Sequence, residues 1–582
     1  MNNLSNYKKP SLLHEVLEWL SDHIVAFLCG LATVLSLFAI FQNIEYQEND
    51  SIVMSLVRGI YVLFCTTLSL DEGDALFNNL AAASIKVIVA ASILKVYLKQ
   101  VGFTFDSQWA KFSKKHIIVC GSGEIAVTAA MVLASATKVV LIADKTIDDA
   151  NVSQLRKKGV VIIISQGDDN RNLRTCQVNK AEILLAFHAD YSDNIMLCKL
   201  ALKLVNNGNQ LRCLCNVPDI NLKNTLSTSD FFSPEDVVNV TLINPIELAA
   251  RKMLEDYPPD IALATNENVQ LKIVLIGLGS IGQSLLFYLG QLGHYRGGHQ
   301  PLITVIDHNS HQQYQQLINR IPALSHLLEM TPMDANINDL SEMQSDELFG
   351  HSFNPSVVYV CTKNEICNVT AAKKIDRARS KAGLSYNIVV VDPPGGNLIQ
   401  EFNQHNKRIQ VVPLFSNKSS AIDVGINRDA LRLFESAKDQ MAQIIHQDYL
   451  DKNPTATINE DWQYLDESIR DSNRYAAAHI DIKLRAIGRK QLSFNADAET
   501  FVFSEQELDS LQRLEHARWC AQKRLAGWQY ADVRDDKKLL HPCLVNFDDL
   551  PEHEKLKDRQ SIQNIPHLLK MVNLMIAADT NV

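Results

Sequence analysis

A short apolar strand, a glycine turn and a helix follow one another twice in this chain, and this repeat constrains the fold most. The first copy reads HIIVCGSGEIA from residue 116, and the second reads LKIVLIGLGSIGQS from residue 271. Small residues permit the tight turn and let the first amides of the helix face a phosphate group. The turn positions are Gly121, Gly123 and Ala126 in the first copy and Gly277, Gly279 and Gly282 in the second. The pattern predicts two α/β domains of the Rossmann type.

An acidic residue follows the second strand of each predicted domain. VVLIAD ends at Asp144, and LITVID ends at Asp307 after an inserted HYRGGHQ loop. An acid about 20 residues after such a turn can bind a ribose hydroxyl. Further apolar runs predict more strands at 159–165, 181–187, 211–217, 356–362 and 387–392. We expect the two domains to span 116–255 and 271–425, although each could be a Rossmann fold that no longer binds nucleotide.

The overall composition excludes some functions. A chain of 582 residues is too long for one hydrophobic core and should form about three or four domains. Its formal charge of −10 argues against general binding to nucleic acid. The 11 cysteines form no metal-like CxxC pairs, which indicates reduced, cytosolic thiols and no metal site.

The first hundred residues are apolar enough to enter a membrane. After an amphipathic segment at 1–20, residues 24–44 are uncharged and long enough for a spanning helix. A second apolar stretch covers 80–98 and is interrupted by Lys86, while 52–74 is apolar at first and ends in acids. Basic residues flank both ends of 21–100 and acids dominate its middle, so both chain termini should face the cytoplasm.

Two spanning helices with a re-entrant segment at 52–74 fit this topology, because three full spans would place the large C-terminal part outside. Helix, re-entrant segment and helix form the pore module of tetrameric cation channels. The sequence thus predicts a multi-pass protein of the inner membrane with a pore module at 21–100 and a connector at 101–115. A two-helix anchor with an amphipathic hairpin remains the alternative.

The first predicted α/β domain resembles a known family. Gly167, Asp168, Asp169 and Asn170 are followed by Leu173 and by KAEILLAFHADYSDN, and this run is similar to the TrkA-N or RCK regulatory domain. The resemblance implies a ligand-gated ion channel in which cytoplasmic RCK domains pull on the pore helices. It also implies NAD(H) or an adenine nucleotide as a regulatory ligand, bound by the two glycine turns, Asp144, Asp168 and Asp307, and no catalytic cofactor.

The expected pore sequence departs from potassium filters, which resemble T-V-G-Y-G-D. The segment that aligns with the filter replaces both glycines, so potassium selectivity does not follow. An acidic mouth would still concentrate cations. Lys86 either faces the pore and repels cations, or it snorkels to the interface or pairs with an acid, and the sequence leaves both interpretations open. The predicted pore residues are Thr66, Thr67, Ser69, Asp71, Glu72, Asp74 and Lys86.

A mainly helical C-terminal domain is predicted at 462–582, after a linker at 426–461. Apolar residues at helical spacing mark a helix over 462–489, and Ser504 and Glu507 form a capping box that starts another. LEHARWCAQKRLAGWQY, HPCLVNFDDL and EKLKDR resemble the RyR domain, the repeat named from ryanodine receptors. This resemblance suggests a ligand-sensing module.

Aromatic and basic residues of this domain could form its ligand site. Trp519, Trp528 and Tyr530 can stack on a base, or they can form the core of a small helical domain. The basic side chains can clamp a phosphate, or they can pair with Glu515, Asp532 or Asp535. The predicted ligand residues are Arg470, Asn473, Arg474, Arg518, Trp519, Trp528 and Tyr530.

No arrangement of residues in the sequence indicates an enzyme. His553 and Glu554 lack the second histidine of HExxH, and no Walker lysine follows either glycine turn. We therefore expect a homo-oligomeric channel, a tetramer in contact with membrane lipid, that conducts cations and responds to a nucleotide or another small ligand. The alternative is a membrane-anchored signalling or defence protein that senses nucleotides and conducts no ions.

Overall fold

The computed structural model describes the part of the chain that follows the predicted membrane segment. The described residues are 106, 110–111, 113–205, 211–218, 222, 226, 240–264, 270–392, 409–413, 437–452, 462, 465, 467–495 and 501–579. Among them no helix is both long and apolar enough to cross a bilayer. The predicted pore module at 21–100, with Thr66, Thr67, Ser69, Asp71, Glu72, Asp74 and Lys86, lies outside the described residues. The chain divides into two compact units, 1–213 and 214–582.

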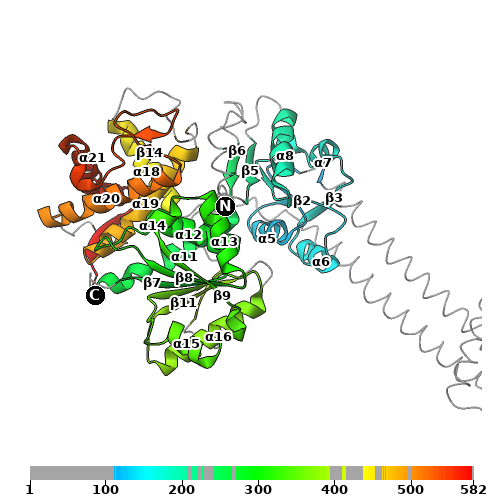
Figure 1. The fold of residues 1–582 in the computed structure, drawn as a ribbon. Coiled ribbons are helices and arrows are strands. Elements are labelled where there is room, and N and C mark those ends of the chain that lie inside the picture. The colour runs from blue at the N-terminus through cyan, green and yellow to red at the C-terminus, as the bar shows by residue number, and fades with distance from the viewer. Residues whose placement is uncertain are drawn as a thin grey trace, which may run out of the picture. The chain divides into compact units, whose positions relative to one another are not determined.

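The first sheet has six strands in the order β3-β2-β1-β4-β5-β6 (Figure 1). β1 pairs in parallel with β2 and β4, and β2 pairs in parallel with β3. Strands β1, β2 and β4 are buried along their whole length, which is typical of parallel sheets covered on both faces. The elements are β1 Ile117–Cys120, α5 Glu124–Leu133, β2 Val139–Ala143, α6 Asp149–Lys157, β3 Val161–Ile164, α7 Asp169–Thr175, β4 Ile183–Ala186, α8 Tyr191–Leu204, β5 Arg212–Asn216 and β6 Val240–Ile243.

The second sheet repeats this design with the order β12-β11-β10-β7-β8-β9. All five of its strand pairs are parallel. The two Rossmann-type sheets that the glycine turns predict are thus confirmed. The elements are β7 Lys272–Ile276, α12 Ser280–Leu292, β8 Leu302–Asp307, α13 Ser310–Arg320, α14 Leu324–Leu327, β9 Glu329–Asp334, α15 Glu342–Phe349, β10 Val357–Val360, α16 Glu365–Lys381, β11 Asn387–Asp392 and β12 Ile409–Pro413.

Alternate residues of the second sheet face two separate cores. Val274 and Ile276 of β7 pack with α15 and α16 on one face, while Ile273 and Leu275 pack with α12 and α13 on the other (Figure 1). This alternation follows from the two-residue period of a strand. α11 (Pro245–Asp256) packs on α12 through Ala250 and Met253. Residues before the second sheet therefore help to cover it.

The C-terminal domain is mainly helical. Its hydrophobic core includes Met441 of the helix α18 (Ala437–Lys452). Part of the segment predicted as a linker, 426–461, therefore forms a helix of this domain. The predicted capping box is confirmed, since Ser504 Oγ accepts from Glu507 N and Glu507 Oε2 accepts from Ser504 N. The elements are α18 Ala437–Lys452, α19 Glu467–Ala486, β13 Arg489–Ser493, α20 Glu505–Leu525, β14 Gln529–Tyr530, β15 Leu540–His541, α21 Glu552–Gln563, α22 Ile565–Met571 and β16 Leu574–Ala578.

The second sheet and the C-terminal helices share one hydrophobic core. Tyr475 and Ile482 of α19 and Ala521 of α20 belong to the same buried cluster as α12. A partly buried ion pair adds to this interface, since Nε and Nη2 of Arg485 on α19 each donate to Asp260 at 2.9 Å. Residues 214–582 therefore form one packed unit.

Candidate nucleotide-binding sites

The first glycine turn joins β1 to α5 at the carboxyl edge of its sheet. Gly121 has a φ of +134°, and a Cβ at this residue would lie 2.5 Å from the carbonyl oxygen of Phe187. Its amide donates to the Ile142 carbonyl at 2.9 Å, which ties the turn to the end of β2. Only glycine satisfies both the conformation and the close approach. The turn is therefore fixed by backbone packing.

Gly123 and Ala126 complete this turn in different ways. Gly123 caps α5 with ordinary extended angles, and apart from its chain neighbours no described residue lies within 4 Å of the position that a Cβ would take. The first intrahelical bond runs from Val127 N to Gly123 O, so the preceding amides face outward without helical partners. Ala126 is fully buried beneath the turn. The open space beside exposed amides is what a bound phosphate requires.

Asp144 follows β2 at the same edge of the sheet. It is exposed, its Oδ1 accepts from Ser122 Oγ at 3.0 Å, and its backbone amide donates to Ser122 Oγ at 2.6 Å. Ser122 therefore links the acid to the glycine turn. Asp168 lies after β3 and caps α7 by accepting from Arg171 N at 3.0 Å. Asp168 thus caps a helix, while Asp144 is exposed beside the glycine turn.

A carboxylate at the start of α5 opposes an anionic ligand. Glu124 is exposed and lies in the first turn of this helix. Its charge partly cancels the positive end of the helix dipole, where a phosphate would bind. A nucleotide at this turn should therefore bind with modest affinity.

The second glycine turn, between β7 and α12, is tighter than the first at its third position. Gly277 has a φ of +93°, and its Cβ would lie 3.0 Å from the carbonyl carbon of Cys361. A Cβ on Gly282 would lie 2.1 Å from the carbonyl oxygen of Gly277. Gly279 caps α12 with open space around it, as Gly123 does for α5. α12 has no acid in its first turn, unlike α5.

Asp307 in the second domain is held by its neighbours. Its Oδ2 accepts from Leu278 N at 2.8 Å, and its Oδ1 accepts from Gln313 Nε2 at 3.0 Å. The ring of His308 also contacts Oδ1 at 2.6 Å, and the Asp307 side chain is only 13% exposed. A ribose hydroxyl would have to compete with these bonds. The structure thus provides a more accessible acid in the first domain than in the second.

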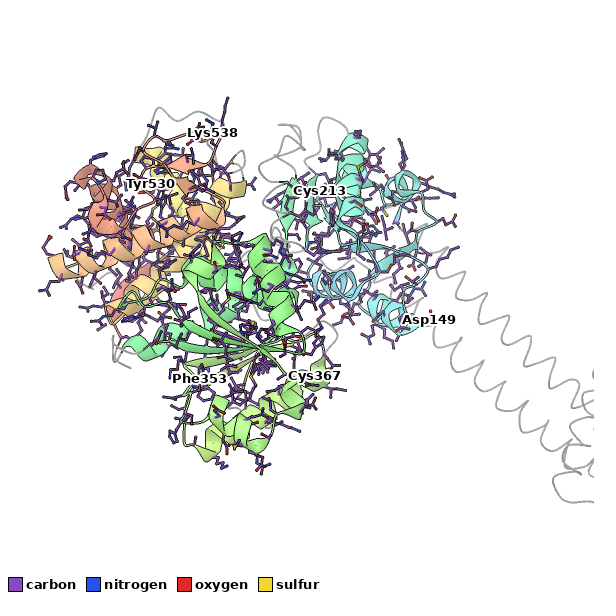
Figure 2. All side chains as sticks on the ribbon, in the orientation of Figure 1. Asp149, Cys213, Phe353, Cys367, Tyr530 and Lys538 are labelled. Carbon is purple, nitrogen blue, oxygen red and sulfur yellow. The ribbon has the colours of Figure 1, made fainter. Side chains whose placement is uncertain are left out.

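A half-buried aromatic cluster lies in the C-terminal domain. The rings of Trp519 and Trp528 both meet His541 edge to face, with centroids 4.9 and 6.0 Å away. The ammonium of Lys523 lies 4.4 Å from the centroid of Trp528, a cation–π distance. Burial and the charge of Arg534 lower the pKa of Lys523. Tyr530, labelled in Figure 2, is 55% exposed and donates to Asp532 at 2.7 Å.

Arg518 does not reach this cluster's surface. Its guanidinium is buried and donates to both oxygens of Glu515, at 2.7 and 3.1 Å, and to Gln522 at 2.9 Å. Lys483 of α19 binds the same carboxylate at 2.5 Å. Of the two interpretations that the sequence left open, the structure places Arg518 in the ion pair with Glu515. An exposed phosphate clamp at this position would need a rearrangement of the pair.

The other predicted ligand residues of the C-terminal domain have separate partners on α18, on α19 and in the segment just before α19. Arg474 donates at 2.7 Å to Asp439 and to Asp471, and its guanidinium lies 6.0 Å from the Trp462 ring. Arg470 is buried and donates to the Leu465 carbonyl, while Asn473 donates to the Ile469 carbonyl. The structure does not bring these three residues together with Trp519 and Trp528 through any described bond.

His516 and Cys520 form a further buried cluster with Asp558. Nδ1 of His516 lies 3.5 Å from Asp558, while Nε2 lies 2.9 Å from the Val545 carbonyl and 3.3 Å from Cys520 Sγ. Burial alone would lower the pKa of His516, but its contacts with Asp558, Cys520 and Val545 raise it to about 10. Both ring nitrogens of His516 therefore have protein partners inside the C-terminal domain.

Two family models match this chain. The TrkA-N domain model matches residues 117–220, and the RyR domain model matches residues 504–578. The chain carries a TrkA-N domain and a RyR domain. Both resemblances that the sequence predicts are thereby confirmed.

Several solved structures of the GsuK channel are similar to this chain. The structure named GsuK Channel is 16% identical, has a TM-score of 0.36, and the match covers 69% of this chain and 96% of that one. The GsuK channel bound to NAD is 13% identical with a TM-score of 0.35, covering 69% and 81%. GsuK bound to ADP is 16% identical with a TM-score of 0.32, covering 69% and 96%.

Sequence reasoning missed side chains in both matched domains. Ser122 lies between the two small residues of the TrkA-N turn, a position that the glycine pattern leaves free. Lys523 follows Trp519 by four residues, so helical spacing already places both on one face of the RyR helix α20. His541 begins the HPCL run, but its contact with both tryptophans depends on the loop that follows β14.

Proposed function

We propose that this chain is a subunit of a nucleotide-regulated membrane channel. The TrkA-N glycine turn carries the proposal, because it combines open space at Gly123, outward amides of α5 and the accessible acid Asp144 at one edge of a sheet. The apolar stretches at 24–44 and 80–98 support a membrane location. The subunits would form a cation-conducting tetramer in the inner membrane with both termini in the cytoplasm.

The ligand of the TrkA-N domain would be an adenine nucleotide such as ADP or NAD(H). Its diphosphate would approach the α5 amides beside Gly123, and a ribose hydroxyl would donate to Asp144. The GsuK structures were solved with ADP and with NAD, which makes these two nucleotides the first probes. The nucleotide would act by population shift, favouring the arrangement of cytoplasmic domains in which the pore is open or the one in which it is closed. It would serve as a regulator, and the chain would catalyse no reaction.

Calorimetry on the purified full chain tests the binding step. ADP or NAD should bind, and Gly123→Val should weaken binding by at least about tenfold because a branched side chain fills the phosphate space. Gly279→Val is the matched control, since it makes the same change at the same helix position of the second domain. Both glycines are N-caps with open surroundings and extended angles, so the two variants should lose a similar, small amount of stability, about 1 kcal/mol. Equal loss of binding in the two variants would contradict the assignment to the first turn.

Recording in planar bilayers tests conduction. The purified chain should give single-channel currents whose open fraction changes with ADP or NAD, and its mass should correspond to a closed oligomer. Nucleotide binding without any current would instead favour a membrane-anchored sensor. Reporter fusions after residues 48, 75 and 110 should place the first two outside and the third inside if 52–74 is re-entrant.

A further inference from the structure

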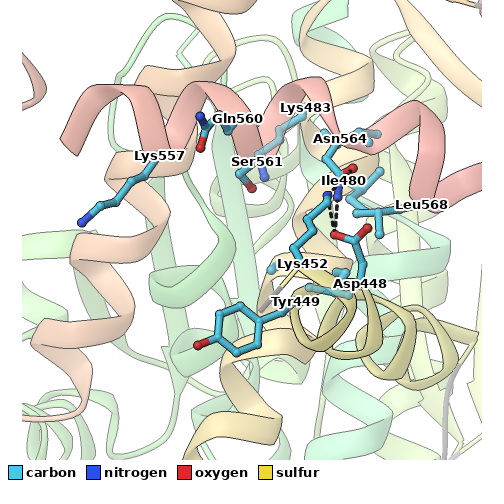
Figure 3. A pocket seen from close by; sticks show the side chains of 13 residues that line it. Asp448, Tyr449, Lys452, Ile480, Lys483, Lys557, Gln560, Ser561, Asn564 and Leu568 are labelled. Carbon is cyan, nitrogen blue, oxygen red and sulfur yellow. Dashed lines mark hydrogen bonds and ion pairs between the residues drawn. The ribbon is translucent and has the colours of Figure 1, made fainter. Parts of the chain in front are cut away.

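A pocket of about 270 Å³ opens between four helices of the C-terminal domain, α18, α19, α21 and α22 (Figure 3). This volume is near the lower end of the range for small-molecule sites, roughly 300–1,000 Å³. Its floor is apolar and consists of Ile445, Ala476, Ile480, Ile565 and Leu568. The pocket is distinct from the aromatic cluster, because Trp519 and Trp528 do not line it.

Polar side chains surround this floor, and most of their charge is positive. The lining includes Lys452, Lys483 and Lys557 but only one carboxylate, that of Asp448. In Figure 3, Lys557 lies on one side of the pocket and the bonded pair of Lys452 and Asp448 on the other. Lys452 also donates to Asn564 at 3.0 Å, and Lys557 binds Glu554 at 2.7 Å while remaining 66% exposed.

Lys483 brings buried positive charge to the pocket. Its side chain is 3% exposed, and its ammonium binds Glu515 at 2.5 Å. Arg518, equally buried, binds the same carboxylate at 2.7 Å. Two buried cations therefore share the Glu515 carboxylate, while the other acid nearby, Asp558, is paired with His516. The positive charge around Glu515 is costly away from water. An anion in the pocket would offset part of that charge.

We propose that this pocket binds a small organic anion with a compact apolar body. The acid group, a carboxylate or phosphate, would lie near Lys483 and Lys557, and the apolar body would pack on Ile480 and Leu568. Because Lys483 lies on α19 and its partner Glu515 on α20, such a ligand would act on the contact between these helices. This inference is independent of nucleotide binding by the TrkA-N domain.

Three probes separate the two features of the ligand. Naphthoate supplies an apolar body and a charge, naphthamide supplies the same body without charge, and acetate supplies the charge alone. In ligand-observed NMR on the full chain, naphthoate should bind at least about ten times more tightly than naphthamide, as expected for a charge-assisted contact. Acetate should not bind detectably. Equal binding of naphthoate and naphthamide would overturn the proposal.

Variants locate the site. Lys557→Gln should lower the affinity for naphthoate about tenfold and leave the affinity for naphthamide unchanged. The control Lys537→Gln, on an exposed loop outside the pocket, should change neither affinity. Ala476→Met fills the floor with a residue that favours helices and should abolish binding of both aromatic probes. If this variant melts at a lower temperature, Ser561→Met on α21 tests the same point from the exposed side. Naphthoate binding that survives both filled pockets would place its site elsewhere.

Discussion

The two glycine turns have the same backbone role but differ in what surrounds their acids. In the first domain, Asp144 is exposed and touches the turn only through the side chain of Ser122. In the second, Asp307 binds the backbone of the turn itself at Leu278 N and is also held by Gln313. The first acid can exchange its partner for a ligand at little cost. The second acid is part of the structure of its turn.

The third turn position shows the same contrast. Ala126 fits beneath the first turn, whereas a Cβ on Gly282 would overlap a carbonyl oxygen. The second turn is therefore more tightly packed at this position, and its helix α12 is the one that contacts α19 and α20. The two copies of the motif therefore differ in accessibility. Asp144 beside the first turn is exposed, whereas the second turn leads into the hydrophobic core that α12 shares with α19 and α20.

Substitutions at the third turn position, Ala126 or Gly282, should give the largest difference in the free energy of unfolding between the two domains. Gly282→Val should lower the free energy of unfolding by about 3 kcal/mol or more, because a side chain must displace the Gly277 carbonyl. Ala126→Gly should cost only about 1 kcal/mol through helix propensity. Urea unfolding of the full chain would measure both. Similar costs would show that the two turns are equally packed.

Removing charge from the two acids should separate binding from stability. Asp144→Asn should lower the affinity for ADP or NAD by roughly ten- to a hundredfold. It should change the free energy of unfolding little, since the Asp144 side chain is exposed. Asp307→Asn should instead lower stability by about 1–3 kcal/mol, because the bonds with Leu278 and Gln313 weaken. Calorimetry and urea unfolding on the same preparations distinguish these outcomes, and the reverse pattern would exchange the roles of the domains.

The pH dependence of stability should differ between the two compact units. Burial lowers the pKa of His116 in the first unit and of His294 in the second, each from 6.5 to about 4. The unfolded chain then binds more protons than the folded one, so both units lose stability as pH falls from 6.5 toward 4. In the second unit, His516 has a pKa raised to about 10, and its contribution is lost as pH rises from 6.5 to 10.

Among the histidines that the structure describes, His516 alone has a raised pKa, so the second unit should weaken in alkali through this histidine, by up to about 1.4 kcal/mol per pH unit. Tryptophan fluorescence follows this unit well, since three of the five tryptophans, Trp462, Trp519 and Trp528, belong to it. His516→Gln should flatten the alkaline slope and leave the acid side unchanged. An alkaline slope that persists in this variant would remove His516 as its cause.

The smallest effect is expected for Ser122→Ala. This change removes two hydrogen bonds with Asp144 at an exposed position and should cost less than about 1 kcal/mol. Because Asp144 loses its partner, nucleotide affinity should stay the same or rise slightly. A loss of affinity comparable to that of Asp144→Asn would mean that Ser122 itself contacts the ligand.

Much of the fold could be predicted from local sequence patterns. Strands buried on both faces, such as Val139–Ala143 and Asn387–Asp392, contain continuous apolar runs, and the sequence predicts them. β6, β9 and β12 were not predicted. β9 (Glu329–Asp334) lies at the edge of its sheet, is at most half-buried and contains a proline, so its sequence EMTPMD resembles a loop.

The candidate sites show where prediction from sequence ends. The glycines and the acids of both turns follow from spacing, because the motif is local. The burial of Arg518 does not follow from spacing. Its partner Glu515 lies on the same helix, but the second cation that binds Glu515, Lys483, comes from α19 and is brought there by the tertiary fold. The exposure of Asp144 and the confinement of Asp307 also depend on neighbours brought together by the tertiary fold.

α12 has a further consequence for how the second unit moves. Of its 13 residues, 11 are buried, and it runs from the glycine cap Gly279 into the core shared with α19 and α20. A helix enclosed in this way cannot fray separately, so its amides should exchange with solvent deuterium only when the whole unit opens. The exchange rate of the α12 amides would thus report global unfolding of this unit. Faster exchange at loops or pocket helices of the same unit would then identify local opening.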